Sequence, residues 1–166
     1  MNPAWVVRTA RLVLKPVAWS DLADLQALKG NPSVFAIMLG GVRSPVQVAD
    51  ELAADIAFWG AHGVGMWAIR EAGETFRGLV GIMQRPDGRG MSLRFALSSG
   101  AQGRGIGREA AGAALRYAHH RAGLPRIVAV AREENIASRI VLGGIGMREC
   151  DSFSRDGYRM IVYESP

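Results

Sequence analysis

The sequence predicts a single α+β domain in which helices cover a central mixed sheet. Two observations support this prediction. The chain has 166 residues, of which 49% are hydrophobic and 21% charged, and this length suits one hydrophobic core rather than two. Strand-like and helix-like patterns also follow one another in an order typical of a mostly antiparallel sheet. We therefore expect one domain over residues 1–166, with about six or seven strands flanked by four helices.

Each expected element has its own local signals. Alternating apolar residues over 11–17 predict a first strand, which Pro16 ends. Ser20 and the pair Ser44-Pro45 are typical helix starts. Branched and aromatic residues dominate the later strand segments, and the alanine-rich segment after Gly105 favours a helix. The predicted strands are 11–17, 66–71, 77–84, 91–98, 126–131, 147–153 and 158–164, and the predicted helices are 20–29, 44–62, 105–122 and 135–143.

Cysteine, histidine and hydropathy patterns exclude several classes of protein. Cys150 is the only cysteine, which excludes an internal disulfide and multi-cysteine metal sites. His119 and His120 are adjacent and so lie on different faces of a helix, which is poor geometry for a metal. No apolar run approaches the ~20 residues that a membrane span needs, and Arg8 and Arg11 interrupt the N-terminal apolar stretch. We expect a cytoplasmic protein that needs neither a metal nor a membrane.

The charge balance favours an anionic ligand. The net charge is +5, and of the 20 basic residues only Lys15 and Lys29 are lysines. The planar fork of arginine suits phosphate and carboxylate groups. The arginines are spread along the chain, and the sequence has neither a recognition-helix pattern nor an aromatic strip for base stacking. A phosphorylated small molecule is therefore favoured over nucleic acid.

One glycine-rich segment, Gln102-Gly103-Arg104-Gly105-Ile106-Gly107-Arg108, lies between a predicted strand and a predicted helix. Glycines there let backbone N–H groups approach a ligand, and a helix N-terminus adds partial positive charge, so the segment suits phosphate binding. It is not a dinucleotide-binding fingerprint, because Arg108 stands where the third glycine is needed. It is not a P-loop either, because no Gly-Lys-Ser/Thr follows. The plain alternative is a tight turn into a helix.

Four segments together resemble the GNAT superfamily of acyl-CoA-dependent N-acyltransferases. Gln102-x-x-Gly105-x-Gly107 matches the superfamily signature Gln/Arg-x-x-Gly-x-Gly/Ala. The other three segments resemble the Rim-type branch, which acetylates the N-termini of ribosomal proteins. They are the opening strand at 10–16, the later strand at 126–130 followed by Asn135-x-x-Ser138, and the turn at 142–147, where Met147 replaces an aromatic residue. The resemblance covers residues 10–163 and implies a GNAT-like fold.

The resemblance also implies how acetyl-CoA is held. In similar proteins the backbone N–H groups of this loop, here Gln102, Gly103, Arg104, Gly105, Ile106 and Gly107, bind the pyrophosphate. Arg104 and Arg108 either add charge for the phosphates or lie on a solvated helix face. The pantetheine arm pairs with the end of the preceding strand, here about Phe95 to Ser98, so Leu97 and Ser98 belong to the expected cofactor site.

Asn135 and Ser138 lie three residues apart, so both side chains can face one ligand from a single helical turn. The resemblance implies that Asn135 contacts coenzyme A and that Ser138 protonates the departing thiolate. From the residues alone, Asn135 is a helix N-cap, and the two roles are compatible.

Ser92 occupies a position where many relatives carry a glutamate that acts as the general base. A serine cannot replace a carboxylate, although it can hold a water that relays the proton. Asp87 is the nearest upstream acid and is more simply explained as a turn residue. A missing base penalises amines of high pKa most, so we expect an acceptor of low pKa such as a peptide N-terminus.

The resemblance thus implies acetyl transfer from acetyl-CoA to a primary amine of a protein N-terminus or a small molecule. The alternative is a non-catalytic acyl-CoA-binding module that has lost its base. Residues 31–43 either line the acceptor pocket or cover the core, and with the turn at 152–156 they are expected to carry acceptor specificity. Similar proteins often dimerise, so a homodimer is a further expectation.

Overall fold

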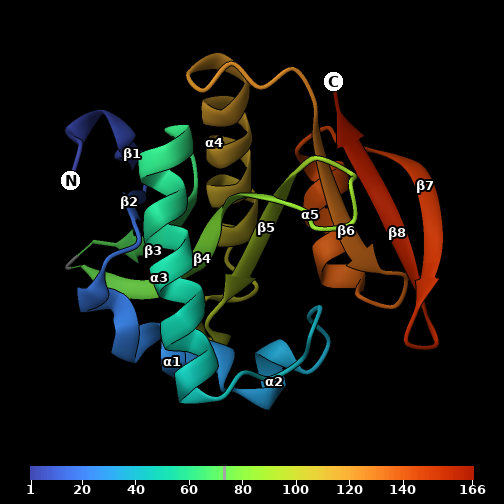
Figure 1. Ribbon diagram of the computed structural model, residues 1–166, viewed down its shortest axis with the longest axis horizontal. Helices are drawn as coiled ribbons and strands as arrows, with labels where there is room; N and C mark the ends of the chain where they lie inside the picture. Colours follow the sequence, from blue (N-terminus) through green and yellow to red (C-terminus); the bar gives the residue numbers. More distant parts are fainter. Residues whose placement is uncertain (73) are drawn as a thin grey trace.

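A mixed sheet runs through the centre of the computed structural model, which describes residues 1–72 and 74–166 (Figure 1). Within the described chain the sheet has eight strands in the order β1-β2-β3-β4-β5-β6-β8-β7. The strands are β1 Val7–Arg8, β2 Leu12–Pro16, β3 Met66–Glu71, β4 Thr75–Gln84, β5 Met91–Leu97, β6 Ile127–Arg132, β7 Arg148–Arg155 and β8 Tyr158–Ser165. The α-helices are α1 Leu22–Lys29, α2 Pro32–Phe35, α3 Pro45–His62, α4 Ile106–His120 and α5 Ile136–Gly144. The predicted α+β class is confirmed.

Helix α3 shows how local signals set the limits of an element. The Ser44 hydroxyl accepts a hydrogen bond from the Gln47 N–H at 3.2 Å, and the Gln47 side chain accepts one from the Ser44 N–H at 2.8 Å. This reciprocal cap, with Pro45 in the first turn, confirms the predicted start. The helix ends where Gly63 adopts a left-handed conformation, with φ of 66°.

The strand connections place one parallel pair in the middle of an otherwise antiparallel sheet. Strands β2 to β5 pair as antiparallel neighbours, which confirms the expected mostly antiparallel sheet. Helix α4 then carries the chain across to β6, which runs parallel to β5. The final hairpin of β7 and β8 turns at Asp156 and Gly157, both at positive φ, as the sequence predicts.

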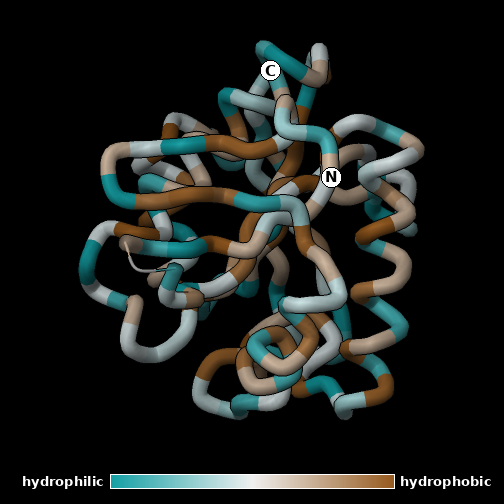
Figure 2. The backbone as a smooth tube through the Cα atoms, turned by 90° about the vertical axis from the view of Figure 1, so that its left-hand side faces the viewer, coloured by the Kyte–Doolittle hydropathy of each residue, from teal (hydrophilic) through white to brown (hydrophobic). Residues whose placement is uncertain are grey.

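Helices cover both faces of the sheet. Figure 1 shows α3 on one face and α4 and α5 behind the other, and the hydrophobic residues gather along the strands between them (Figure 2). Ala68 and Ile69 are successive residues of β3 that belong to different hydrophobic clusters, because side chains alternate across a strand. The cluster on the α4 face includes Ile69, Val80, Ile82, Leu93, Ala110 and Ala114, and the cluster on the α1–α3 face includes Leu25, Leu52, Met66, Ala68, Leu79 and Ala96.

Two short elements exceed the prediction. Strand β1 pairs with β2 through only two residues, too few for an alternating pattern to reveal. Helix α2 begins directly after the signal that ends α1, because Asn31 caps it by accepting from the Ser33 N–H at 3.0 Å. The Gly30-Asn31-Pro32 segment therefore stops one helix and starts another. Of the described helices, none combines the length and apolar character that crossing a bilayer requires.

Candidate active site

The two central parallel strands separate along their length and leave a wedge between them. β5 and β6 pair only at Ser92 and Val128, near their starts. Beyond that point a cavity of about 330 Å³ opens between the strands. It is lined by residues 93–96 of β5, residues 129–132 of β6 and the first turn of α5, together with side chains from α1 to α3. The backbone edge of β5 that faces this cavity has no strand partner in the described chain after Ser92.

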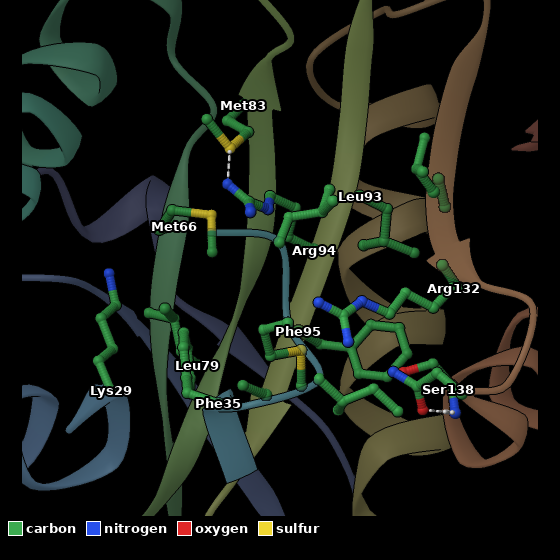
Figure 3. Close-up of a pocket in the computed structure, with 18 of the residues that line it drawn as sticks. Lys29, Phe35, Met66, Leu79, Met83, Leu93, Arg94, Phe95, Arg132 and Ser138 are labelled. Carbon is green, nitrogen blue, oxygen red and sulfur yellow. Dashed lines mark hydrogen bonds between the residues drawn. The ribbon is translucent and has the colours of Figure 1, made fainter. Parts of the chain in front are cut away.

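The cavity connects the two faces of the sheet. Leu93, Phe95 and Ala129 line it from the α4 face, since they belong to or pack against the cluster on that side. Arg94 and Ala96 alternate with them and line it from the α1–α3 face. Figure 3 shows these strands side by side, with Ser138 near Phe95 at one end and Arg94 beside Met83 at the other. Two ligands can therefore meet in the wedge from opposite sides.

The predicted phosphate-binding loop lies between the end of β5 and α4. Gly103 and Gly105 both have φ of 75°, a left-handed conformation that favours glycine. The backbone N–H groups of residues 103–108 donate no hydrogen bond to any other described residue. Six consecutive amides at the N-terminus of a 15-residue helix form an anion site of the kind that binds phosphates. The loop therefore offers amides to an anion, and its role in phosphate binding stays a prediction.

Arg104 lies in this loop but faces away from the amides toward β3. Its guanidinium makes two hydrogen bonds to the Glu71 carboxylate, the shorter at 2.7 Å. The hydrogen bond from Arg104 lowers the pKa of Glu71, and Arg77 contributes in the same direction. The Arg104 carbonyl accepts a hydrogen bond from Arg11 at 2.8 Å, and Arg11 also pairs with Glu109 at 3.0 Å. Arg104 is therefore engaged in positioning the loop.

Arg108 is exposed beside α5, in a groove between α4 and α5 that starts at the loop. Its guanidinium lies close to Gly144, and the groove also holds Arg116, about two helical turns farther along α4. Neither arginine forms an ion pair with a described residue. This leaves a basic groove continuous with Gly105 and its amides.

Asn135 and Ser138 both line the cavity, as their spacing predicts. The Asn135 side chain accepts a hydrogen bond from the Ser138 N–H at 3.3 Å, which confirms that Asn135 caps α5. The Ser138 hydroxyl makes no hydrogen bond to a described residue and is free to act on a ligand. Leu97 and Ser98 lie partly buried at the end of β5, directly before the loop.

Ser92 does not line the cavity. It lies where β5 and β6 are still paired, its residue is 1% exposed, and its hydroxyl has no described hydrogen-bond partner. A water relay through Ser92 therefore has no support from its position. Asp87 sits in the β4–β5 turn, where Arg85 holds it at 2.7 Å, and it does not reach the cavity either.

Asp55 and Arg94 are cavity residues that the sequence analysis missed. Asp55 is partly buried on α3, and burial raises its pKa to about 6 against the opposing effects of Lys29 and Arg94. A signal was available, because Asp55 is three residues after buried Leu52, on the apolar stripe of α3. Arg94 likewise stands among inward-facing positions of a central strand. A charged residue in a core position is a functional candidate.

The segment after α2 supplies the opposite wall of the cavity. Phe35, Ile37, Met38 and Leu39 line it, and Phe35 is also part of the core cluster on that face. The segment therefore covers the core and also lines the cavity, and its role in acceptor binding stays a prediction. In the part of the chain that the structure describes, no three His, Cys, Asp or Glu side chains gather as a metal site would require.

Comparison with known proteins identifies relatives of this architecture. Residues 11–148 match the family described as Acetyltransferase (GNAT) domain. An acetyltransferase from Agrobacterium tumefaciens is 27% identical, with a TM-score of 0.87 over 100% of this chain and 95% of that one. No curated protein sequence shows significant similarity.

Two further solved structures share the fold at lower identity. The ribosomal-protein alpha-N-acetyltransferase RimL, in complex with coenzyme A, is 17% identical, with a TM-score of 0.80 over 96% of this chain and 97% of that one. Spermidine N-acetyltransferase from Vibrio cholerae, in complex with coenzyme A and spermine, is also 17% identical, with a TM-score of 0.79 over 95% and 96%.

Proposed function

Since this chain belongs to the GNAT acetyltransferase family, we propose that it transfers an acetyl group from acetyl-CoA to a primary amine. The observation that carries the proposal is the row of six unpaired amides at residues 103–108, next to a cavity that passes through the sheet. The amine attacks the thioester directly, and no covalent enzyme intermediate is needed. Cys150, the one thiol, lies exposed on β7 and outside the cavity.

The loop and its groove fit the charged part of acetyl-CoA. The amides of residues 103–108 bind the pyrophosphate oxygens, helped by the partial positive charge of α4. Arg108 and Arg116 add the positive charge of the groove that runs from Gly105 between α4 and α5. Arg104 contributes through the loop backbone, because its side chain is paired with Glu71.

The wedge between β5 and β6 fits the pantetheine arm and the thioester of acetyl-CoA. Acetyl-CoA supplies the activated thioester. The open backbone edge of β5 from Phe95 to Ser98 pairs with the pantetheine amides as an added strand, and its N–H groups polarise the thioester carbonyl. Asn135 holds the first turn of α5 in place. Ser138 donates a proton to the sulfur as it leaves.

A thermal-shift titration with acetyl-CoA tests the phosphate site. At a hundredfold excess over Kd, binding stabilises the native state by about 2.7 kcal/mol, which corresponds to a rise in Tm of about 5–10 °C for a chain of this size. Gly105→Asp places a carboxylate among the amides and is expected to abolish this rise.

Gly123→Asp is the matched control for that substitution. Gly123 has φ of 71°, close to the 75° of Gly105, and lies in a loop beyond the far end of α4. Both variants therefore carry the same backbone strain, and only Gly105→Asp should lose binding. A full thermal shift in Gly105→Asp would place the cofactor elsewhere.

A second candidate function is a binding module that holds acyl-CoA without catalysis. It is favoured by one observation, the buried serine at position 92 where a base is expected. Release of free thiol from acetyl-CoA in the presence of a panel of primary amines separates the two functions. Amine-dependent thiol release supports the enzyme, whereas a thermal shift without it supports the module.

A further inference from the structure

Charged side chains cluster on the α1–α3 side of the cavity, where the acceptor would enter. Four cations face two carboxylates there, so the cavity is positively charged when both carboxylates are ionised. The cations are Lys29, Arg43, Arg94 and Arg132, and the carboxylates are Glu51 and Asp55.

Glu51 is already occupied by two of these cations. Lys29 and Arg43 each approach a different Glu51 oxygen at 3.2 Å. Arg132 lies 3.7 Å from Glu134 and stacks on the Tyr158 ring, with 3.8 Å from its guanidinium carbon to the ring centroid. These pairs leave Arg94 and Asp55 as the charges to be explained.

Arg94 has no carboxylate partner among the described residues. Its one side-chain hydrogen bond runs to the thioether sulfur of Met83 at 2.8 Å, as Figure 3 shows. A thioether is a weak acceptor, and a guanidinium carries five N–H donors. Burial lowers the pKa of Arg94, and the nearby Arg43 and Arg85 add to this effect. A partly buried guanidinium that has no carboxylate partner provides a strong site for an anion.

Asp55 is the complementary group. It makes no hydrogen bond or ion pair with any described residue, although Arg94 is near enough to influence its pKa. The two side chains therefore do not satisfy each other. One ligand that carries both signs of charge can satisfy both of them.

Resting on the proposed function, we propose that the acceptor is an amine that also carries a carboxylate, with Arg94 binding the carboxylate and Asp55 receiving the proton of the amine. The nitrogen gives up two protons. Asp55 takes the first before the attack, and the second replaces the proton that Ser138 passes to the sulfur. The C–N bond forms as the C–S bond breaks, so the products are the amide and the free thiol. A polycation such as spermidine is disfavoured, because the cavity holds more cations than carboxylates.

Two sources supply such a ligand: a free amino-acid-like metabolite, or a peptide whose N-terminal residue is followed by an acidic one. Thiol release at saturating acetyl-CoA is measured with matched pairs that differ only in a carboxylate or a carboxamide. The small-molecule arm compares the α-amide of aspartic acid with the α-amide of asparagine, so that the reacting group is an α-amine in both. The peptide arm compares amidated peptides with Glu or Gln at the second position, and spermidine serves as the polycation.

In at least one arm, KM is expected to be about ten- to a hundredfold lower for the carboxylate member than for its carboxamide, which is the usual range for a charge-assisted hydrogen bond. The arm that shows the difference identifies the source. The inference would be overturned by equal KM values within each pair. It would also be overturned if the carboxamide members or spermidine were acetylated and no carboxylate member was. The proposed function fails separately, when no amine of either kind releases thiol or when acetyl-CoA gives no thermal shift.

Arg94→Met then tests the residue itself. The expected result is that KM for the carboxylate acceptor rises to that of its carboxamide, so that the ratio of the two KM values falls to about one. Arg70→Met is the matched control, because Arg70 is a partly buried arginine paired with Asp21 outside the cavity. A retained preference in Arg94→Met would overturn the assignment. If that variant does not fold, Arg94→Lys keeps the charge, and the wild-type pairs still decide the inference.

Discussion

At the scale of single residues, Asp55 differs most from an ordinary surface carboxylate. Burial raises its pKa to about 6, while Lys29 from α1 and Arg94 from β5 lower it and Glu51 on the same helix raises it. Arg43, from the segment before α3, is held by Glu51. A carboxylate with a pKa near 6 is ionised at neutral pH and still basic enough to accept a proton.

The rate of transfer should therefore follow the ionisation of Asp55. In the wild type, kcat/KM is expected to rise with pH through about 6, because only the ionised carboxylate accepts a proton. Asp55→Asn should remove this limb of the pH profile and lower kcat about a hundredfold or more. Steady-state kinetics from pH 5 to 8 check this, with the acetyl-CoA thermal shift as the control for an intact cofactor site. An unchanged profile in Asp55→Asn would assign the base elsewhere.

Asp55 should also affect the stability of the fold, and here its replacement is expected to be favourable. Because folding raises the pKa of Asp55, the native state favours its protonated form, and that stabilisation is present below pH 4 and lost as pH rises through about 6. Asp55→Asn is therefore expected to raise the free energy of unfolding by about 1–2 kcal/mol at pH 8, after allowance for partial exposure, and to change it little at pH 4. Urea unfolding at both pH values measures this. Equal effects at the two values would contradict it.

At the scale of elements, helix α3 carries both an N-terminal cap and two carboxylates that line the cavity. The Ser44–Gln47 cap holds the first turn, and Glu51 and Asp55 follow on the next two turns. Ser44→Ala is expected to lower the free energy of unfolding by about 1 kcal/mol, because the Gln47 N–H loses its acceptor.

Ser44→Asp is the control for this cap, because it restores an acceptor at the same position and should retain the stability. Both variants should keep the acetyl-CoA thermal shift, since the loop at 102–108 belongs to α4. Chemical denaturation measures the change in stability, and the thermal-shift titration with acetyl-CoA measures cofactor binding. A loss in Ser44→Asp equal to that in Ser44→Ala would show that the hydroxyl acts in some other way.

Strand β5 contributes three different environments within a few residues. Ser92 lies where β5 is paired on both sides, Arg94 faces the α1–α3 side of the cavity, and Phe95 faces the α4 side. The change occurs because pairing with β6 ends after one residue, so the following residues border a cavity instead of a strand. Residue type alone could not reveal this difference.

At the scale of the whole molecule, the divergence of β5 and β6 opens a cavity that both faces of the sheet line, and under the proposed function cofactor and acceptor approach it from opposite faces. The acceptor must then reach the thioester as a neutral amine. At pH 7 an α-amino group with a pKa of about 7.7–8.0 is roughly a tenth neutral, whereas a lysine amine near 10.4 is neutral less than a thousandth of the time. Transfer to a carboxylate with a pKa of about 6 is likewise less unfavourable for the α-amine.

An acceptor with a low pKa therefore remains a prediction. With peptides that offer either an α-amine or a lysine amine, blocked at the other position, we expect kcat/KM at pH 7 to be at least tenfold higher for the α-amine. Mass spectrometry of the acetylated products measures both rates. Equal or faster acetylation of the lysine amine would refute it.

Local geometry made much of this protein readable from its sequence. The order of the main helices and strands, the cap at Ser44, the cap at Asn135 and the left-handed glycines of the 102–108 loop depend on residues within a few positions of one another. Even the free amides of the loop follow from a helix that begins after glycine. Such features need no knowledge of distant contacts.

Only the tertiary structure could bring the acceptor side together. Asp55 and Arg94 are far apart in sequence and meet because α3 covers the face of the sheet where β5 leaves β6. Contacts between distant segments also bury Ser92 and pair Arg104 with Glu71, although both residues stand at motif positions. A loop can be predicted from its own backbone preferences. A cavity and the charges in it depend instead on where pairing and packing between separate elements end.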